Sequence, residues 1–396
     1  MTSPTFEILD SLASVAAQEW NRLVSDGSPF LEYGFLRGLE VTDCLSPQSG
    51  WTTSILVARD EGDLVGAVPL YRKNNSAGEF VFDWSWAEAA MRAGISYYPK
   101  GVVAVPFSPV TGTRILTAED CENRHRLARC LLEKTLDVAD ELGLSSVHFN
   151  FIPTGERALY EEVGLPIRQG IQYHWRNSDG TEENSTYRDF DEFLARFRSK
   201  RRSNIRRERR KLAENGVTTR IVRGDAITTT DIRRIFGYYV DTVRKHFYGR
   251  QYLSEEFFHH LHKNLTQRLH LVFCELDGEP FAGTFNLFKG DRLYGRYWGC
   301  ERDINYAHFE ACIYRPVQWC IEQGVGAFEP GAGGDHKFDR GFEPTLTYSA
   351  HYVRNPRLRR AVSKFLRQER RHIDSQLDEL HDDSPFKSPT APRRSS

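Results

Sequence analysis

The stretch LVFCELDGEPFAGTFNLFKGDRLYGRYWG, residues 271–299, decides the fold of this chain. It consists of three apolar and aromatic runs separated by two turn signals, DG at 277–278 and KGD at 289–291. An Asp-Gly pair between two such runs favours a tight hairpin, because both central positions of that turn need a positive φ. We therefore predict a three-stranded antiparallel meander with strands at 271–276, 281–288 and 292–299.

The first half of the chain repeats this order of elements. Strands are predicted at Ile55–Arg59 and Leu64–Tyr71 on either side of a turn, and at Glu79–Trp86. Each meander is followed by a helix and two further strands, predicted at 123–142, 146–151 and 172–177 in the first half and at 308–322, 327–330 and 349–355 in the second. The endings HWRN (174–177) and HYVRN (351–355) also match. These parallels favour an internal duplication, although any two α+β halves share part of such an order.

The length of 396 residues suits two domains, because a single core rarely grows beyond about 250–300 residues. We predict an α+β chain with two domains in tandem, 1–178 and 179–380, each a mixed and mostly antiparallel sheet flanked by helices. Residues 381–396 are rich in Ser, Pro and Arg. They have few apolar side chains to offset their ordering entropy, so we predict a disordered tail.

Composition narrows the class of protein further. With 40% hydrophobic and 12% aromatic residues the chain reads as globular, and its N-terminus lacks the basic start and apolar stretch of a signal peptide. No uncharged stretch approaches the ~20 residues of a membrane-spanning helix. The seven cysteines form no CxxC pair, so neither disulfides nor a metal site are expected. We predict a cytoplasmic protein with reduced thiols, no transmembrane segment and no tightly bound cofactor.

A strongly basic helix is predicted between the two halves, at about 190–214. Arg196–Lys211 holds ten Lys or Arg residues against one acidic residue, whereas the whole chain has a net charge of only −1. Asp189 and Glu192 resemble a capping box, and Asn215-Gly216 resembles a helix stop. Like charges four residues apart repel, so we favour an anionic partner over a solvated face. The candidate binding residues are Lys200, Arg201, Arg202 and Arg206.

The second half contains a polar, glycine-rich loop that the first half lacks, FEPGAGGDHKFDRGF at 328–342. An amine must be neutral to attack an acyl group, and a carboxylate or imidazole can take its proton. The candidates for that role are Glu329, Asp335, His336 and Asp339. Lys337 or Arg340 can stabilise a developing oxyanion or a substrate phosphate, and Lys337 is the catalytic residue we place first. Surface positions and salt bridges are the alternative reading of His336 and Asp339.

Further substrate-binding candidates lie on other elements. In the second half they are Arg296, Tyr297 and Trp298 on the third strand of the meander and His308 at the start of the next helix. In the first half, the aromatic and proline-rich stretches 82–86, 97–100 and 106–114 fit a substrate groove as well as a core. The candidates there are Asp83, Trp84, Tyr98, Lys100 and Thr111.

The chain resembles the FemAB-like predicted N-acyltransferases, relatives of the Fem peptidoglycan aminoacyltransferases within the GNAT superfamily. The matching stretches are 28–40, 50–73, 80–87, 97–114, 198–217, 294–300 and 328–352. The resemblance implies tandem GNAT-like domains, in agreement with the duplication. It also implies that Lys200, Arg202 and Ile205, and Lys337 with Phe338 and Phe342, lie near the substrate. Two features depart from related proteins: no QxxGxG/A pyrophosphate loop separates Gly299 from His308, and no long coiled-coil arm is evident.

We therefore predict an N-acyltransferase that moves an acyl or aminoacyl group to an amine, in peptidoglycan-type or other cell-envelope metabolism. Acyl-CoA and aminoacyl-tRNA are the candidate co-substrates. The basic helix is expected to hold a phosphorylated small molecule, a lipid-linked precursor or tRNA, and peripheral membrane contact is compatible with it. The alternatives are a non-catalytic protein that binds RNA or an anionic membrane on a degenerate transferase fold, and a lipid-modifying acyltransferase.

Overall fold

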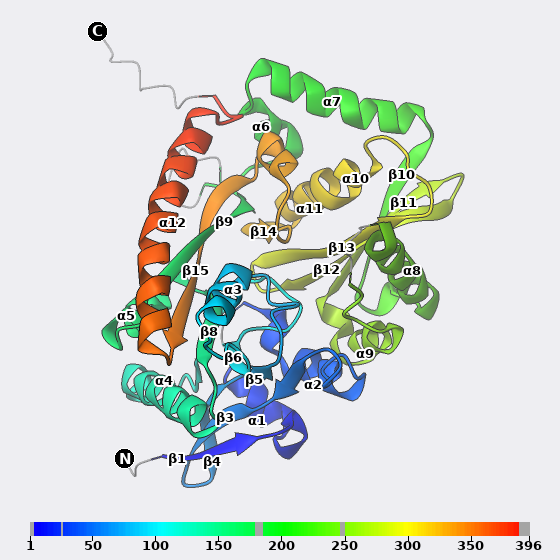
Figure 1. The fold of residues 1–396 in the computed structure, drawn as a ribbon. Helices are drawn as coiled ribbons and strands as arrows, with labels where there is room; N and C mark the ends of the chain where they lie inside the picture. The colour runs from blue at the N-terminus through cyan, green and yellow to red at the C-terminus, as the bar shows by residue number, and fades with distance from the viewer. Residues whose placement is uncertain (1–3, 25–26, 179–184, 246–249, 388–396) are drawn as a thin grey trace. The chain divides into compact units, whose positions relative to one another are not determined.

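The computed structural model describes residues 4–24, 27–178, 185–245 and 250–387. The chain forms two compact units (Figure 1). Unit 1 comprises residues 1–171, 252–265 and 346–374, and unit 2 comprises 172–251, 266–345 and 375–396. Within the described residues, no helix combines the length and the apolar character that a membrane span requires.

The two units interleave along the sequence rather than following one another. Strands β9 (Ile167–Arg176) and β15 (Glu343–Val353) each contribute residues to both units, as does helix α12 (Pro356–Asp382). A boundary inside a strand carries no turn signal, which explains why the sequence suggested consecutive segments instead. The division into two tandem domains, 1–178 and 179–380, stays a prediction.

Unit 1 contains two sets of strands with helices packed on them. An antiparallel sheet has the order β1-β3-β4-β7, and a second set runs β2-β5-β6-β8-β15, with β6 and β8 parallel. A core of aliphatic side chains, among them Leu56, Leu131 and Val147, lies between α4 and the strands. The strands are β1 (Thr5–Leu9), β2 (Trp51–Thr53), β3 (Ile55–Asp60), β4 (Asp63–Val68), β5 (Leu70–Lys73), β6 (Lys100–Val103), β7 (Leu116–Thr117) and β8 (Ser146–Ile152). The helices are α1 (Ala17–Arg22), α2 (Tyr33–Val41), α3 (Trp84–Arg92), α4 (Arg124–Glu141), α5 (Arg157–Glu162) and α9 (Glu255–Leu265).

The predicted third strand of the first half, Glu79–Trp86, is wrong. Residues from Trp84 onward form helix α3, and Asp83 occupies its N-cap position. The alternation of aromatic and polar residues in FVFDWSW imitates a strand, yet Trp86 and Ala90 are four residues apart and are buried together on one helix face. The duplication is therefore less complete than the sequence suggests.

Unit 2 is built on one sheet in the order β10-β11-β12-β13-β14-β9. Its strands are antiparallel except for the pair β13 and β14, which is parallel. The predicted meander is confirmed, and Asp277 and Gly278 both have a positive φ, as its tight turn requires. The strands are β10 (Val217–Arg223), β11 (Leu269–Leu276), β12 (Glu279–Lys289), β13 (Arg292–Cys300) and β14 (Ala327–Glu329). The helices are α6 (Phe190–Ala195), α7 (Ser199–Glu214), α8 (Thr229–Lys245), α10 (Ala307–Phe309) and α11 (Arg315–Gln323), with the π-helical turn η6 (Glu310–Tyr314) and the 3-10 helix η7 (Asp335–Arg340).

Helices cover both faces of the unit 2 sheet. Helix α8 lies close against β13, where a side chain at Gly299 would collide with the backbone oxygen of Tyr238. On the opposite face, Ala307 and Ala311 from α10 and η6 pack against Val272 and Ala282 of the meander. The sheet is thereby held rigid between two layers, which is the support that a precise site on its strands needs.

The predicted single basic helix at 190–214 is two helices, α6 and α7, separated by residues 196–198. Its start is confirmed, because the Asp189 side chain accepts a hydrogen bond from the backbone N–H of Glu192. Its end at Asn215 is confirmed as well, and Gly216 has a positive φ of 75°. The break coincides with a strand-like bridge between Phe197 and Phe386, whose rings lie 4.8 Å apart.

The structure also differs from the predicted disordered tail 381–396. Residues 381–387 are placed, and the buried ring of Phe386 joins the aromatic cluster of Phe193 and Phe197. Two backbone hydrogen bonds, from Arg198 to Pro385 and from Lys387 to Arg196, fix this segment. The buried ring of Phe386, its contact with the guanidinium of Arg196 and these two hydrogen bonds together stabilise a segment whose polar composition suggested disorder. Residues 388–396 lie outside the described residues.

Candidate active site in unit 2

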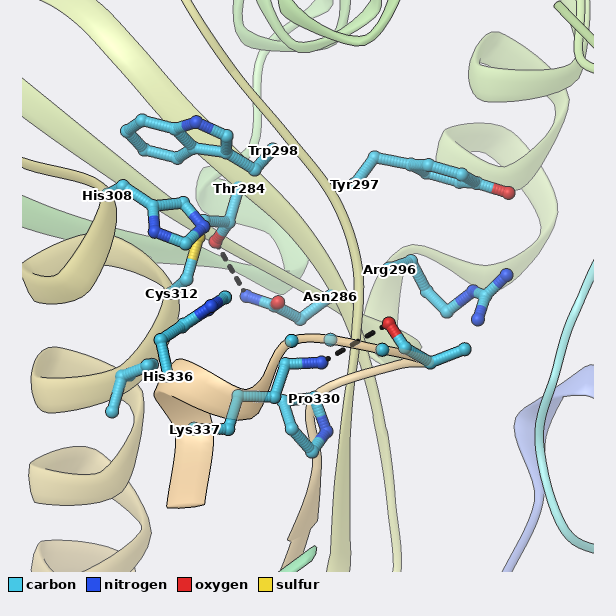
Figure 2. Close-up of a pocket in the computed structure, with 15 residues that line it drawn as sticks. Thr284, Asn286, Arg296, Tyr297, Trp298, His308, Cys312, Pro330, His336 and Lys337 are labelled. Carbon is cyan, nitrogen blue, oxygen red and sulfur yellow. Dashed lines mark hydrogen bonds between the residues drawn. The ribbon is translucent and has the colours of Figure 1, made fainter. Parts of the chain in front are cut away.

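The site begins where the two parallel strands of the sheet part. β13 and β14 pair through three residues each, from Arg292 opposite Ala327 to Tyr294 opposite Glu329. β14 then ends, whereas β13 continues to Cys300. A pocket of about 380 Å³ opens beyond this point, between β13 and the loop that follows β14 (Figure 2). Gly295 allows the loop to come close, since a Cβ there would lie 3.1 Å from the Cα of Pro330.

Four segments of unit 2 contribute to the pocket wall. A β-bulge between β12 and β13 leaves Arg296 as an extra residue, because Phe285 faces Tyr297 while Asn286 faces Gly295. The bulge brings four consecutive residues of β13 to the pocket, where regular alternation would bring every second one. The wall consists of Thr284, Asn286, Gly295, Arg296, Tyr297, Trp298, His308, Cys312, Ile313, Pro330, Ala332, Gly333, Gly334, His336 and Lys337.

Lys337 is the buried cation of this pocket, with a side chain that is 8% exposed. Its Nζ donates to the carbonyl oxygens of Gly331, at 2.8 Å, and Ala332, at 3.4 Å. An ammonium group has three hydrogens, so one remains for a molecule in the pocket. Among the described residues, no carboxylate forms an ion pair with Lys337. Burial is the main cause that lowers the pKa of Lys337 to about 8, and the nearby charge of Arg296 acts in the same direction.

Two imidazole rings, those of His308 and His336, meet edge to face beside Lys337, with centroids 5.3 Å apart. Burial lowers the pKa of His308 to about 4, and the neighbouring His336 and Lys337 act in the same direction. Burial also lowers the pKa of His336. Both rings are therefore neutral near pH 7, and a neutral imidazole can accept a proton.

The predicted acidic residues of the loop lie elsewhere. Glu329 is buried at the end of β14, where it accepts a hydrogen bond of 2.5 Å from Arg292. Asp335 is exposed and accepts from the hydroxyl of Tyr173 at 3.5 Å. Asp339 forms an ion pair of 2.7 Å with Arg201. None of the three lines the pocket, so Lys337 and His336 are the predicted catalytic residues that the structure brings together there.

The buried side chain of Arg340 connects η7 to helix α7. Its guanidinium donates two hydrogen bonds to Glu208 of α7, at 2.9 and 3.0 Å, and one to the hydroxyl of Tyr314 at 2.8 Å. It also lies 3.3 Å from the ring centre of Phe309. A cation with these partners holds the loop that carries Lys337, and it does not line the pocket.

The basic residues of α7 divide into paired and unpaired groups. Arg206 pairs with Asp191 at 2.9 Å, and Arg209 makes a two-pronged contact with Glu310. Lys200, Arg207 and Lys211 are exposed, and none of them contacts a carboxylate within the part of the chain that the structure describes. They fall within about 40° on the helix, because seven and eleven residues are close to two and three turns. We call Lys200, Arg207 and Lys211 the basic stripe.

The remaining basic-helix candidates, Arg201 and Arg202, lie outside this stripe. The first pairs with Asp339, and the second is half-buried. The predicted residues of β13 and α10, on the other hand, all reach the pocket. These are Arg296, Tyr297, Trp298 and His308.

Three of the five candidates of unit 1, Asp83, Tyr98 and Lys100, belong to a buried polar network. The ammonium of Lys100 is fully buried and donates to Ser76 and Glu79, both at 2.9 Å, and to Asp83. The hydroxyl of Tyr98 is 2.8 Å from that of Ser76. Burial raises the pKa of Glu79 to about 7. Trp84, at 60% exposed, and the half-buried Thr111 lie outside this network.

Sequence reasoning missed several wall residues, above all Thr284 and Asn286. A signal was present in the run FAGTFNLF, where two polar residues are two positions apart on a strand that is otherwise apolar. Such residues point to the same face of the sheet. Both are buried, with Asn286 2% exposed.

The pocket where this parallel strand pair opens, beside a lysine and two neutral imidazoles, is the candidate active site. The family model described as peptidoglycan biosynthesis/recognition, FemAB-like, matches residues 11–388, and the chain belongs to this family. The predicted class of enzyme, an acyltransferase, is confirmed by this membership, and the predicted α+β fold is confirmed by the structure.

Solved structures share the fold at low sequence identity. FemX matches with a TM-score of 0.54 and 10% identity over 88% of this chain and 98% of its own. L-PGS from Bacillus licheniformis matches with a TM-score of 0.50 and 13% identity over 87% and 98%. The C-terminal domain of a putative lysylphosphatidylglycerol synthetase from Agrobacterium fabrum gives 0.52 and 10% over 87% and 95%. No curated protein sequence matches this chain.

Proposed function

We propose that this protein transfers an aminoacyl or acyl group to a primary amine in the unit 2 pocket. The observation that carries the proposal is Lys337, a buried cation without a carboxylate partner among the described residues, which has one N–H left for the pocket. A donor that is held by fixed groups and aimed at a carbonyl oxygen stabilises the negative charge that develops there during acyl transfer.

The reaction proceeds by addition and elimination at the acyl carbon. The amine nitrogen attacks, a C–N bond forms, and the carbonyl π electrons move to oxygen, where the ammonium of Lys337 donates its hydrogen bond. The intermediate then collapses, the bond to the leaving oxygen or sulfur breaks, and its electrons leave with that atom. The proton lost by nitrogen passes to the neutral imidazole of His336 and on to the leaving group.

The electrostatics of the pocket favour the reactive form of the amine. Arg296 and Lys337 are cations, both imidazoles are neutral, and no carboxylate is among the wall residues. The same surroundings lower the pKa of Lys337 to about 8. An amine that enters the pocket is subject to the same desolvation and repulsion, so its neutral form is favoured.

For the donor we favour an aminoacyl-tRNA over acyl-CoA. The segment between Gly299 and His308, CERDINYAH at 300–308, lacks a glycine-rich loop for a pyrophosphate. The fold is that of FemX and of L-PGS. The basic stripe supplies three unpaired cations over about 16 Å of helix, a spacing that suits a nucleic-acid backbone. The acceptor we infer is an amine of a cell-envelope precursor, in line with the family description.

Neutralising the basic stripe is expected to weaken tRNA binding in a salt-dependent way. In the variant Lys200→Gln, Arg207→Gln, Lys211→Gln, the slope of log affinity against log salt should become shallower by about 2 to 3, because each lost phosphate contact removes about 0.7 to 0.9. Filter binding of uncharged total tRNA between 50 and 300 mM salt measures the slope. The matched control replaces three exposed cations of α12, Arg360, Lys364 and Arg371. An equal change in the control would remove the stripe from tRNA binding.

Activity should decline at alkaline pH as Lys337 loses its proton. Since burial lowers the pKa of Lys337 to about 8, the cationic form that stabilises the oxyanion is present below that pH and is lost above it. The kcat of the wild-type protein should therefore fall about tenfold per pH unit above pH 8 to 9. Lys337→Arg keeps its charge throughout this range and should show a lower but flat profile. An identical alkaline decline in both proteins would assign it to another group.

The function itself is tested with a panel of donors and acceptors. Total tRNA charged with isotope-labelled amino acids, and acetyl-CoA, serve as donors, while L-alaninamide and an amine-bearing muropeptide serve as acceptors. Mass spectrometry should detect an amide product that requires both donor and protein. Salt-sensitive tRNA binding without amide formation from any donor would instead favour the non-catalytic alternative.

A further inference from the structure

The side chain of Asn286 is fixed in one orientation at the wall of the pocket. Its Nδ2 donates to the hydroxyl of Thr284 at 2.9 Å (Figure 2). It also donates to the backbone oxygen of His270 at 3.0 Å and lies 3.3 Å from Nδ1 of that residue. A backbone carbonyl can only accept, so the amide nitrogen must occupy this side. The side-chain oxygen is consequently turned the other way.

His270 completes this support. Its ring is fully buried and packs edge-on against Trp319, with centroids 4.4 Å apart. Burial lowers the pKa of His270 to about 3, so the ring is neutral. Its Nδ1 lies 3.3 Å from the amide nitrogen of Asn286. The amide nitrogen is thus enclosed by a backbone carbonyl, a hydroxyl and a buried ring.

The side-chain oxygen of Asn286 is a hydrogen-bond acceptor at the pocket wall. Among the described residues, no donor reaches it, although the side chain lines the pocket. The charged groups of the wall, Lys337 and Arg296, can only donate. The carbonyl oxygens of Gly331 and Ala332 already accept from Lys337. A fixed, open acceptor beside these donors is suited to an N–H group of a ligand.

We propose that Asn286 positions the acceptor amine and selects amines over hydroxyl groups, an inference that rests on the proposed function. The Oδ1 atom accepts one N–H of the primary amine, which turns the nitrogen lone pair toward an acyl carbon whose oxygen faces Lys337. A neutral primary amine has two hydrogens; it loses one in the reaction and keeps the other on Asn286, through to the amide product. A hydroxyl group has a single hydrogen, and binding it to Asn286 leaves none for the base.

The first test compares transfer with hydrolysis in Asn286→Leu, using total tRNA charged with labelled amino acids or acetyl-CoA as donor and L-alaninamide as acceptor. Amide formation should fall about 10- to 100-fold, because a misplaced nucleophile loses that much reactivity. Hydrolysis of the same donor by water should change less than about twofold. Asn286→Ala removes the same oxygen and serves as a second variant. An unchanged ratio of transfer to hydrolysis would overturn the inference and leave the proposed function intact.

The second test needs no turnover. L-Alaninamide is titrated into protein that carries labelled isoleucine δ-methyl groups, and the signal of Ile313, a wall residue, is followed. The dissociation constant should be about tenfold higher in Asn286→Leu than in wild type, as expected for one lost hydrogen bond. Asn264→Leu, the same change at an exposed residue of unit 1, should bind as wild type does. Equal affinity in all three proteins overturns the inference, whereas Asn286-dependent binding without turnover supports it and counts against the proposed function alone.

Discussion

Replacing Lys337 by Met is expected to lower kcat for amide formation by about 10²- to 10³-fold, the usual cost of losing one oxyanion donor. The fold should survive, because Met has a similar length and the pocket wall offers no carboxylate that would be left unpaired. Product formation is measured by mass spectrometry with saturating donor and L-alaninamide. Lys263→Met, a change of the same kind at an exposed position of α9, is the control. Full activity in Lys337→Met would remove the loop 328–342 from the chemistry.

Lys337→Met is also expected to change the thermal stability of the protein. Burial lowers the pKa of Lys337 from 10.5 to about 8, so the folded protein binds fewer protons than the unfolded chain between these values. The free energy of unfolding contributed by this group therefore rises with pH across that window and is lowest below pH 8. Lys337→Met should raise the melting temperature at pH 7, and the gain should shrink toward pH 10. A melting temperature that drops at pH 7 would contradict this.

Glu208→Ala is expected to destabilise unit 2 by about 3–5 kcal/mol, because it leaves the buried guanidinium of Arg340 without its counter-charge. Glu208 also accepts a hydrogen bond of 2.5 Å from the hydroxyl of Tyr314, so a second buried group loses its partner. Urea unfolding followed by circular dichroism measures the change. Glu214→Ala removes an exposed glutamate from the same helix, one that faces Arg210 at 3.5 Å, and should cost less than about 0.5 kcal/mol.

A double variant separates charge from packing. Glu208→Met combined with Arg340→Met replaces both buried charges by apolar side chains, which is often neutral for stability. It should recover most of the loss that Glu208→Ala causes. If the double variant is as unstable as the single one, the specific hydrogen bonds matter more than the unpaired charge. If Glu208→Ala costs less than about 1 kcal/mol, the tie between α7 and η7 is not a stabilising element.

The elements that could be predicted from sequence were those with a local cause. The meander at 271–299 follows from strand runs and an Asp-Gly turn, and the start and end of the basic region follow from Asp189 and Gly216. The errors came from contacts between residues far apart. The break between the helices at 196–198 and the placement of residues 381–387 both involve the pairing of Phe197 with Phe386. No local sequence pattern predicts this pairing.

The same distinction holds for the site. Lys337 and His336 were singled out because they stand in a glycine-rich loop with several charges, and the structure places both at the pocket wall. The ion pairs of the loop could not be predicted, because their partners are distant in sequence. Arg340 pairs with Glu208, and Glu329 pairs with Arg292. Asn286 was predictable in principle from its place beside Thr284 on an apolar strand, but its role depends on the neighbouring strand that carries His270.

The most direct measurement is a crystal structure with a donor analogue that cannot react, either adenosine carrying an alanyl group through a 3′-amide or a coenzyme A thioether whose S-alkyl group keeps a ketone carbonyl. We predict that one of these places its acyl carbonyl oxygen in the pocket between β13 and the loop after β14, within hydrogen-bond distance of Lys337 Nζ. An acyl group that binds outside this pocket, or whose carbonyl oxygen faces away from Lys337, would contradict the proposed site of transfer.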